Sequence, residues 1–164
     1  MPDVVVMVGM PGVGKTTVGG ALARRLGWRF VDTDDVVAAA TGRDVAELIA
    51  TDGIGEFRSA ERAAVGALAS VDEDVVIAVG GGAVLDADNR AALAALGRVV
   101  WLRAGRATLL AHIASDDRER PLLAGDVEAA LDRLLEERSE LYATLATTVV
   151  DIDDRTPDDA ANEV

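Results

Sequence analysis

The stretch VGMPGVGKTT, Val8–Thr17, lies near the start of the chain and directly follows the β-branched run Val4–Val8. Within it, Gly9–Thr16 matches the pattern G-x-x-x-x-G-K-[ST] in full, between a predicted strand and a predicted helix that begins at Thr16. Glycines in such a loop let successive backbone N–H groups converge on phosphate oxygens at the helix N-terminus. The stretch therefore predicts a phosphate-binding loop (P-loop), with a glycine-rich helix cap as the alternative.

The chemistry of the loop residues suggests what each would do. Lys15 would bridge the β- and γ-phosphates of a nucleotide, and the Thr16 hydroxyl would hold Mg²⁺. Lys15 is the only lysine among 16 basic residues, and its compact ammonium suits the narrow mouth of a phosphate loop better than a planar guanidinium does. The other loop residues expected to bind the nucleotide are Gly12, Val13, Gly14 and Thr17.

Length and charge limit the possible functions of the chain. Its 164 residues fit one domain with a single core. The formal net charge of −13 argues against binding to nucleic acid or to anionic membranes. No apolar stretch reaches the roughly 20 residues that cross a bilayer, and no basic segment precedes the first hydrophobic run. We therefore expect a soluble, cytoplasmic protein without a signal peptide.

Residue types that bind metals or form crosslinks are scarce. The chain has no cysteine, which excludes disulfides and thiolate metal sites. The single histidine, His112, lies in a helical pattern with no matching ligand nearby, so we expect no histidine-bound metal. His112, Trp28 and Trp101 are interpreted as packing or surface residues.

The order of apolar runs and helical patterns predicts the fold. Five short apolar runs predict strands at Val4–Val8, Arg29–Val31, Val75–Val79, Val99–Leu102 and Thr148–Ile152. Helical spacing lies between them, at Thr16–Leu26, Asp44–Ala50, Glu56–Ala69, Asp88–Leu96, Ala107–Ile113 and Val127–Ala143. This alternation predicts a five-stranded parallel sheet with helices on both faces, a three-layer α/β/α fold. The charged segment Ser115–Gly125 interrupts the alternation and is a candidate mobile lid.

Polar residues and glycines follow two of the predicted strands. Asp32-Thr33-Asp34 comes after the second strand, at the sheet edge where open α/β proteins bind ligands. In an extended segment both carboxylates project to one side, so one could orient Mg²⁺ waters while the other takes a substrate hydroxyl. Alternatively, Asp34 or Asp35 only caps the next helix. Gly80–Gly82 follows the third strand, either to expose backbone N–H groups to a ligand or to make a tight turn.

Four arginines have two interpretations each. Arg58 lies near the start of a predicted helix and Arg138 near the end of another, and each taken singly is typical of a solvated helix face. Arg118 and Arg120 lie in the candidate lid. They could reach a transferring phosphoryl group when the lid closes, or they could simply keep a loop soluble.

Taken together, these motifs resemble the shikimate kinase family. The matching pieces keep the family's order, with nearly its spacing, from end to end of the chain: GMPGVGKTT (9–17), DTD (32–34), TGRDVAELIATDGIGEFRSAE (41–61), GGGAV (80–84), RPLLAG (120–125) and ERSELYATLA (137–146). The resemblance implies a P-loop NTPase fold like that of nucleoside monophosphate kinases, in one domain spanning 1–164. Its P-loop would be 9–17, its substrate-binding helical region about 33–61 and its lid about 115–125.

The resemblance also implies an activity and an acceptor site. The γ-phosphoryl group of ATP would pass to the 3-hydroxyl of shikimate, in the pathway to chorismate and the aromatic amino acids, in a cytoplasmic monomer. It carries over Asp34 as the residue that binds the ring hydroxyls and as the candidate base. Arg58 and Arg138 become carboxylate binders, and Gly81 and Gly82 offer backbone N–H groups. A small acid with vicinal hydroxyls requires cations at one end and acceptors at the other, as this set supplies.

On the nucleotide side, the resemblance places Asp32 near the one Mg²⁺ of the site. Arg120 becomes the lid arginine that reaches the phosphates, while Arg155 and Pro157 fall where the family holds adenine. A loose phosphoryl transition state depends on positioning and charge neutralisation, which Lys15, Mg²⁺ and Arg120 would supply.

The chain departs from the family's pattern at three places. Ile113, with His112 beside it, stands about seven positions before the lid arginine, where the family often has a basic residue that stacks on adenine. Glu140 stands where proline is usual. After Pro157 only DDAANEV remains, too short for the usual final helix.

Three other functions compete with this interpretation. Another small P-loop kinase, for gluconate or a nucleoside monophosphate, has no evident need for Asp34, Arg58, three glycines and Arg138 together. A small GTPase reads guanine with Asn-Lys-x-Asp, and no lysine besides Lys15 exists to build that motif. A homologue that binds without turnover is disfavoured by the intact Lys15, Asp34 and Arg58.

Overall fold

The computed structural model describes residues 1–164 and contains five strands, eight α-helices and three short 3₁₀ helices. The strands are β1 (Val4–Val8), β2 (Arg29–Asp32), β3 (Val75–Ala78), β4 (Arg98–Arg103) and β5 (Thr148–Asp151). The α-helices are α1 (Lys15–Leu26), α2 (Thr33–Thr41), α3 (Val45–Asp52), α4 (Ile54–Ala67), α5 (Ala87–Leu96), α6 (Arg106–Ser115), α7 (Val127–Leu145) and α8 (Pro157–Glu163). The 3₁₀ helices are η1 (Leu68–Ser70), η2 (Ala83–Leu85) and η3 (Pro121–Leu123).

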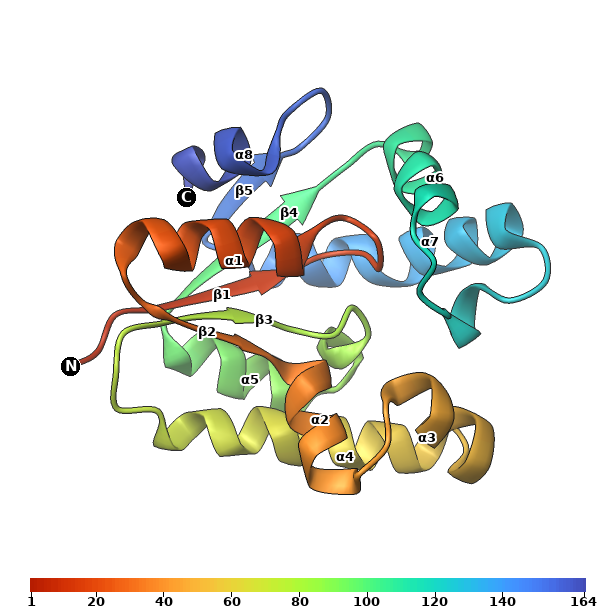
Figure 1. Ribbon diagram of the computed structural model, residues 1–164, viewed down its shortest axis with the longest axis horizontal. Helices are drawn as coiled ribbons and strands as arrows, with labels where there is room; N and C mark the ends of the chain where they lie inside the picture. The colour runs from red at the N-terminus through yellow and green to blue at the C-terminus, as the bar shows by residue number, and fades with distance from the viewer.

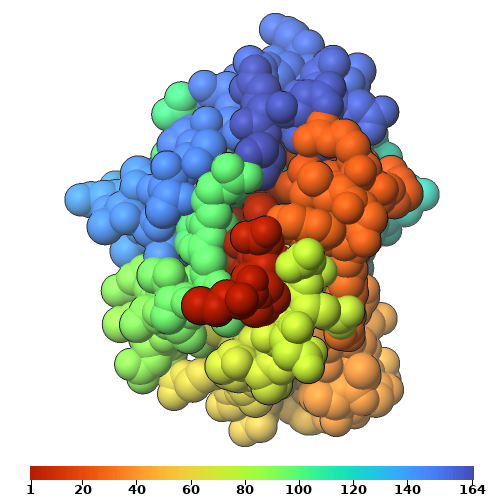
Figure 2. All heavy atoms as spheres, turned by 90° about the vertical axis from the view of Figure 1, so that its left-hand side faces the viewer, coloured from red at the N-terminus to blue at the C-terminus, as the bar shows by residue number.

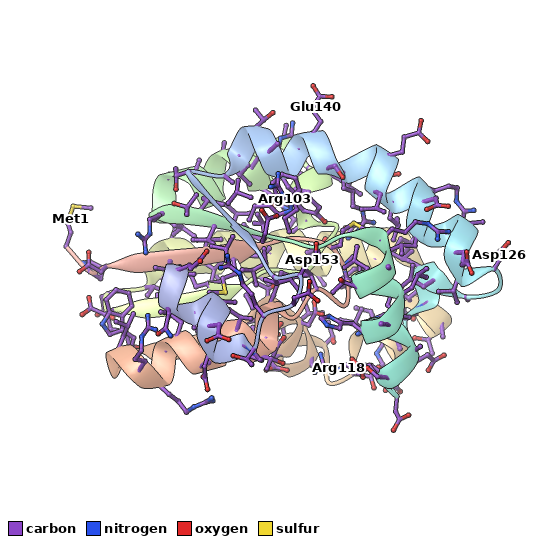
Figure 3. The ribbon with its side chains drawn as sticks, turned by 90° about the horizontal axis from the view of Figure 1, so that it is seen from above. Met1, Arg103, Arg118, Asp126, Glu140 and Asp153 are labelled. Atoms are coloured by element: carbon purple, nitrogen blue, oxygen red, sulfur yellow. The ribbon has the colours of Figure 1, made fainter.

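The five strands form one parallel sheet in the order β2-β3-β1-β4-β5. Helices α1 and α8 cover one face, and α5 and α7 cover the other, as the two side-on views show (Figures 1 and 3). Figure 2, seen from the left-hand side of Figure 1, shows the N-terminal residues lying between the beginnings of β3 and β4. The predicted three-layer α/β/α fold is confirmed.

Central strand β1 sets the position of the ligand-binding edge. It pairs with β3 on one side, Val6 opposite Ile77, and with β4 on the other, Val6 opposite Val99. All five residues of β1 are buried, as a strand enclosed by two neighbours and two helix layers requires. The chain leaves β1 where connections to its two neighbours diverge, so the loop after β1 lies at the topological switch point of the sheet.

Two helices were absent from the periodicity-based prediction. In α2, Asp32 is the N-cap and accepts a hydrogen bond from the Asp34 backbone N–H at 2.9 Å. Its one buried apolar residue, Val37, joins a small cluster with Leu48 of α3 and Phe57 of α4, separate from the main core. A nine-residue helix with so short an apolar stripe gives little periodic signal.

The chain after β5 also ends in a helix, which corrects the expectation that too few residues remain for one. Thr156 and Asp159 form a reciprocal capping box, with Pro157 in the first turn. Ala160 and Ala161 are buried, and Arg25 of α1 donates to the Ala161 carbonyl oxygen at 2.7 Å. Strong capping and alanine packing therefore suffice for α8.

The other predicted elements are present, with bounds shifted by at most two residues. No helix in the structure is both long enough and apolar enough to pass through a membrane.

Gly97 joins α5 to β4, and a Cβ atom at this position would overlap the Val4 carbonyl oxygen in β1. We expect Gly97→Ala to lower the free energy of unfolding by about 1–3 kcal/mol, because neighbouring backbone has to move. Gly66→Ala is the matched control: Gly66 is exposed on α4 with open space around it, so alanine should stabilise by about 0.5–1 kcal/mol. Urea unfolding measures both, and equal stabilities would contradict the packing argument.

Candidate active site

A cleft of about 470 Å³ opens along the carboxyl edge of the sheet. The loop after β1, the first turn of α2, helix α4, the loop after β3, the lid segment and the start of α8 all contribute to its walls. Every residue expected from the sequence to bind a nucleotide, an acceptor or a metal lines it: Gly12, Val13, Gly14, Lys15, Thr16, Thr17, Asp32, Asp34, Arg58, Gly81, Gly82, Arg120, Arg138, Arg155 and Pro157.

The P-loop leads into the N-terminus of α1, which has no capping side chain. Gly14 occupies the N-cap position with a φ of 106°, in the left-handed region that favours glycine. By contrast, Asp or Thr side chains cap α2, α3, α5, α7 and α8. The first N–H groups of α1 therefore keep their donors available, at a helix end that attracts anions.

Lys15 reaches back over the P-loop. Its Nζ atom donates to the Gly9 carbonyl oxygen at 2.8 Å and to the Met10 carbonyl oxygen at 3.0 Å. Burial lowers the pKa of Lys15 to about 8, although the nearby carboxylates of Asp34 and Asp32 oppose that shift. A phosphate group would supply the negative charge that stabilises this ammonium.

Asp32 connects the P-loop to α2. Its Oδ2 atom accepts a hydrogen bond from the Thr16 hydroxyl at 2.7 Å, while Oδ1 caps α2. The cap is therefore Asp32, not Asp34 or Asp35. Asp34 lies in the first turn of α2 and not in an extended segment, so the alternation argument for the two carboxylates was wrong even though both line the cleft.

The hydroxyl of Thr16 and the carboxylate of Asp32 are the oxygen ligands that Mg²⁺ prefers. No group of three His, Cys, Asp or Glu side chains that could hold a metal exists elsewhere in the structure. A cation at Thr16 and Asp32 would therefore take its remaining ligands from water and from nucleotide phosphates, as Mg²⁺ commonly does.

Asp34 lies beside Gly80 in the cleft lining. The pKa of Asp34 is raised, chiefly because the protein desolvates its carboxylate and then because Asp32 is close, while Lys15 acts in the opposite direction. A Cβ atom on Gly80 would lie 3.2 Å from Asp34 Oδ1 and 2.6 Å from Glu61 Oε1. Glycine at this position therefore makes room for two carboxylates.

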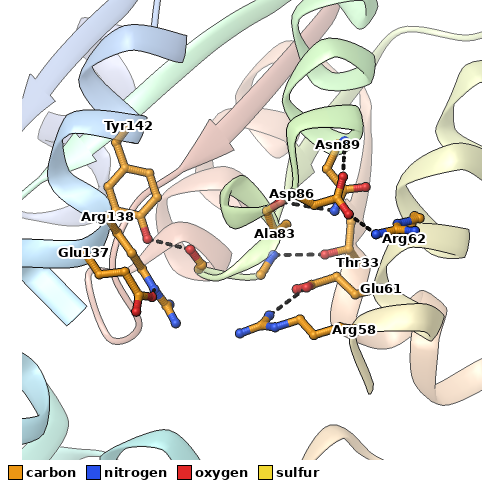
Figure 4. Close-up of polar contacts among 12 residues, drawn as sticks. Thr33, Arg58, Glu61, Arg62, Ala83, Asp86, Asn89, Glu137, Arg138 and Tyr142 are labelled. Carbon is orange, nitrogen blue, oxygen red and sulfur yellow. Dashed lines mark hydrogen bonds and ion pairs between the residues drawn. The ribbon is translucent and has the colours of Figure 1, made fainter. Parts of the chain in front are cut away.

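Arg58 and Arg138 project from opposite sides toward one space, as Figure 4 shows. Arg58 Nη1 donates to Glu61 Oε2 at 2.7 Å, and its guanidinium fills the space where a side chain on Gly82 would be. Arg138 is only 2% exposed, and its Nη1 atom has no hydrogen-bond partner. The interpretation of each arginine as a solvated surface residue is therefore wrong, and an anion between them would satisfy a buried donor.

Two supporting residues were not found from the sequence. Glu61 is 1% exposed, and burial raises its pKa, although the Arg58 guanidinium partly offsets the shift. The only sequence signal for the pairing of Glu61 with Arg58 was their i, i+3 spacing on a predicted helix. Tyr142, one turn after Arg138 on α7, donates from its hydroxyl to the Gly81 carbonyl oxygen at 2.6 Å (Figure 4). Burial raises the pKa of Tyr142 to about 12, so it keeps this donor across the physiological range.

The lid segment places one of its two arginines inward. Arg120 Nη2 donates to Asp116 Oδ2 at 2.7 Å and would lie 3.8 Å from a Cβ atom on Gly12 of the P-loop. Arg118 also contributes to the cleft lining, but its side chain is 66% exposed. Of the two candidates, Arg120 is therefore the one placed beside the P-loop.

The remaining wall comes from α6 and the start of α8. His112 does not merely pack: its Nδ1 atom lies 2.9 Å from the Gly12 carbonyl oxygen, across the cleft wall. Arg155 forms an ion pair with Glu163, and Pro157 begins α8. Trp101 packs against Tyr142, with ring centroids 5.9 Å apart.

Glu140, at the position where proline was expected, points away from α7 toward solvent (Figure 3). It lies outside the cleft lining, so the substitution leaves the burial of Arg138 unaffected.

Comparison with known proteins finds a matching family model, related sequences and similar structures. A family model described as "Shikimate kinase" matches residues 11–164. A shikimate kinase of Frankia casuarinae is 47% identical over 158 residues, covering 96% of this chain and 69% of the relative. The structure of a shikimate kinase from Acinetobacter baumannii in complex with shikimate superposes with a TM-score of 0.93 at 33% identity, covering 99% of this chain and 90% of that one.

A gluconokinase from Sinorhizobium meliloti has a TM-score of 0.62 at 21% identity, covering 99% of this chain and 89% of that one. This likeness concerns the fold alone.

The lowered pKa of Lys15 predicts how ADP binding depends on pH. If the ammonium is required, ADP affinity should fall about tenfold between about pH 7 and about pH 9, because the free enzyme loses this proton as pH rises through about 8. Lys15→Arg is the control: it should bind ADP more weakly, yet without this decline, because a guanidinium does not titrate in that range. Calorimetric titration measures both, and a flat wild-type profile would contradict the prediction.

Proposed function

The chain belongs to the shikimate kinase family, and we propose that it transfers the γ-phosphoryl group of ATP to the 3-hydroxyl of shikimate, giving shikimate 3-phosphate and ADP. One observation carries the proposal. The cleft combines a P-loop at one end with two inward-facing guanidinium groups, of Arg58 and Arg138, at the other. Such a cleft suits a phosphate donor and a small carboxylic acid bound face to face.

At the acceptor end, the carboxylate of shikimate would lie between Arg58 and Arg138. The unpartnered Nη1 of Arg138 and the fixed guanidinium of Arg58 support this placement, because charged bidentate contacts recognise carboxylates well. The backbone N–H groups of Gly81 and Gly82 would add donors. Asp34 would accept hydrogen bonds from the ring hydroxyls.

At the donor end, the P-loop residues Gly12–Thr17 would bind the phosphates of ATP, with Lys15 between the β- and γ-phosphates. Arg120 would neutralise charge on the transferred group, and its position beside Gly12 supports this role. Arg155 and Pro157 would hold adenine, since both line the far wall of the same cleft. Thr16 and Asp32 would hold one Mg²⁺, which supplies charge neutralisation on the phosphates when bound.

The reaction then consists mainly of positioning. Asp34 orients the 3-hydroxyl of shikimate and takes its proton as the oxygen attacks the γ-phosphorus and the bond to the β,γ-bridging oxygen breaks, with that electron pair leaving on ADP. The raised pKa of Asp34 suits a residue that must accept a proton. Lys15 and Arg120 stabilise the charge of the loose transition state. The lid, 115–125, would exclude water from the phosphoryl group.

We also propose that residues 1–164 act as one domain and as a monomer, because one chain supplies every candidate ligand of the cleft. The use of ATP supports a cytoplasmic location.

A panel of acceptors tests the function directly. ADP production should be measured with shikimate, gluconate and nucleoside monophosphates at equal concentrations. We expect turnover with shikimate, because its rigid ring places the carboxylate and the hydroxyls at opposite ends, which suits two guanidinium groups opposite Asp34, whereas gluconate is a flexible open chain and a nucleotide has no carboxylate. Turnover of gluconate or of a nucleotide without turnover of shikimate would overturn the proposal.

Removal of Arg58 should affect shikimate binding above all. We expect Arg58→Ala to raise the KM for shikimate by about tenfold to a hundredfold, because a charged bond to a carboxylate is worth about 1.5–3 kcal/mol. Arg62→Ala is the matched control, since Arg62 lies one turn further along α4 and pairs with Asp86 outside the cleft. Steady-state kinetics compares the two, and an unchanged KM in the Arg58 variant would count against the assignment.

Asp34→Asn separates chemistry from nucleotide binding. We expect turnover to fall by about a hundredfold to ten-thousandfold, because the amide cannot accept the hydroxyl proton. ADP affinity should stay within about threefold of the wild type, since the P-loop is untouched. Turnover and calorimetric ADP titration measure the two quantities. A collapse of ADP affinity would assign Asp34 to the nucleotide site instead.

A further inference from the structure

Helix α6 is fastened at both ends to elements that form the nucleotide side of the cleft. At its start, Asp153 in the loop after β5 accepts hydrogen bonds from the Gly105 N–H at 3.0 Å and from the Thr108 hydroxyl at 2.5 Å. At its end, His112 contacts the P-loop at Gly12. Helix α6 therefore connects the loop after β5, which contains Arg155, with the P-loop, which leads to Lys15.

The contact between His112 and Gly12 has a defined direction. A carbonyl oxygen can only accept, so the 2.9 Å contact requires a proton on His112 Nδ1. Both the neutral Nδ1–H tautomer and the imidazolium carry that proton. The ring therefore holds the Gly12 carbonyl in either protonation state.

This carbonyl belongs to a peptide plane on which the P-loop depends. The other side of the plane is the Val13 N–H, which donates to the Met10 carbonyl oxygen at 3.2 Å. Gly12 has a φ of 82°, and such a residue lets the adjoining peptide rotate easily. Rotation would break the hydrogen bond from Val13 to Met10 and so change the shape of the loop whose backbone N–H groups would bind the phosphates.

The neighbouring residue acts on the same glycine. Ile113 Cγ1 would lie 3.0 Å from a Cβ atom on Gly12, so its side chain packs directly on the loop. Consecutive residues of α6 therefore hold Gly12 by a hydrogen bond and by van der Waals contact.

We propose that His112 is a positioning residue for nucleotide binding, which acts by donating from Nδ1 to the Gly12 carbonyl and so fixing the peptide orientation of the P-loop. Nothing in this role requires contact between the ring and the nucleotide. The inference rests on the proposed nucleotide site and not on the identity of the acceptor. ADP binding therefore tests it even if the acceptor is an acid other than shikimate.

The wild-type protein offers the first test. His112 is the only histidine, so its imidazole signals in a long-range ¹H–¹⁵N spectrum need no assignment. At alkaline pH, where an imidazole is neutral, we expect the Nδ1–H tautomer, with Nε2 unprotonated. The Nε2–H tautomer would overturn the proposal, because Nδ1 could not then donate to Gly12.

Two isosteric variants give the second test. The amide nitrogen of His112→Asn can take the place of Nδ1, whereas that of His112→Gln takes the place of Nε2. We expect His112→Asn to bind ADP within about twofold of the wild type and His112→Gln to bind about fivefold more weakly, as the loss of one hydrogen bond implies. Calorimetric titration with MgADP measures both variants.

Shikimate affinity is measured in parallel and should be unchanged in both, since Arg58 and Arg138 lie on other helices. Equal ADP affinities in the two variants would overturn the proposal, whether both match the wild type or both fall. If both variants match the wild type, the hydrogen bond to Gly12 has no effect on ADP affinity. If both bind ADP more weakly, the effect comes from packing of the imidazole ring and not from the hydrogen bond. Parallel loss of shikimate affinity in the Gln variant would likewise overturn it, as the effect would not be specific to the nucleotide.

Discussion

The arrangement of the cleft depends on one partly buried ammonium group, that of Lys15 at the start of α1, after the loop that follows the central strand. Strand β1 is buried, and in the loop that follows it the Nζ atom of Lys15 donates hydrogen bonds to the carbonyl oxygens of Gly9 and Met10. Burial lowers the pKa of this group to about 8 even though the carboxylates of Asp34 and Asp32 lie near it. A bound phosphate would stabilise the charged form further. The uncapped start of α1 contributes further donors at the same point.

At the acceptor end of the cleft, by contrast, charged side chains are held in place by hydrogen bonds to partly or fully buried neighbours. Glu61 holds Arg58 in place, and Tyr142 holds the carbonyl of Gly81, so the guanidinium and the glycine backbone cannot easily turn away. One oxygen of Glu61 and one nitrogen of Arg138 lack partners. Unpartnered buried polar atoms are costly, and they are accordingly found where a ligand supplies the missing bond. Preorganisation of this kind reduces the conformational entropy that side chains lose when the substrate binds.

The sequence predicted the sheet, its helices and the cleft lining because those features have local signals. β-branched runs mark buried strands, and the P-loop pattern fixes a strand, a turn and a helix together. Helix α2 was missed because one buried valine gives no helical periodicity. The role of Asp32 as its N-cap was missed as well, and the same carboxylate accepts a hydrogen bond from Thr16. The roles of Glu61, Tyr142 and His112 were missed for a different reason. Tyr142 and His112 act through partners that only folding brings close, since Gly81 is 61 residues from Tyr142 and Gly12 is 100 residues from His112. Glu61 is a helical neighbour of Arg58, and what the sequence did not reveal is its burial.

The charge of the whole chain and the charge of the cleft have opposite signs, and the fold reconciles them. With a net charge of −13, the protein repels anions at long range, yet six cationic side chains line one cleft: Lys15, Arg58, Arg118, Arg120, Arg138 and Arg155. Screening limits the long-range repulsion to about 8 Å at physiological ionic strength, whereas the cleft charges act at contact distance in partly desolvated surroundings. Local geometry therefore outweighs net charge. An acidic surface then disfavours large polyanions, while small anions that enter the cleft meet these cationic side chains at close range.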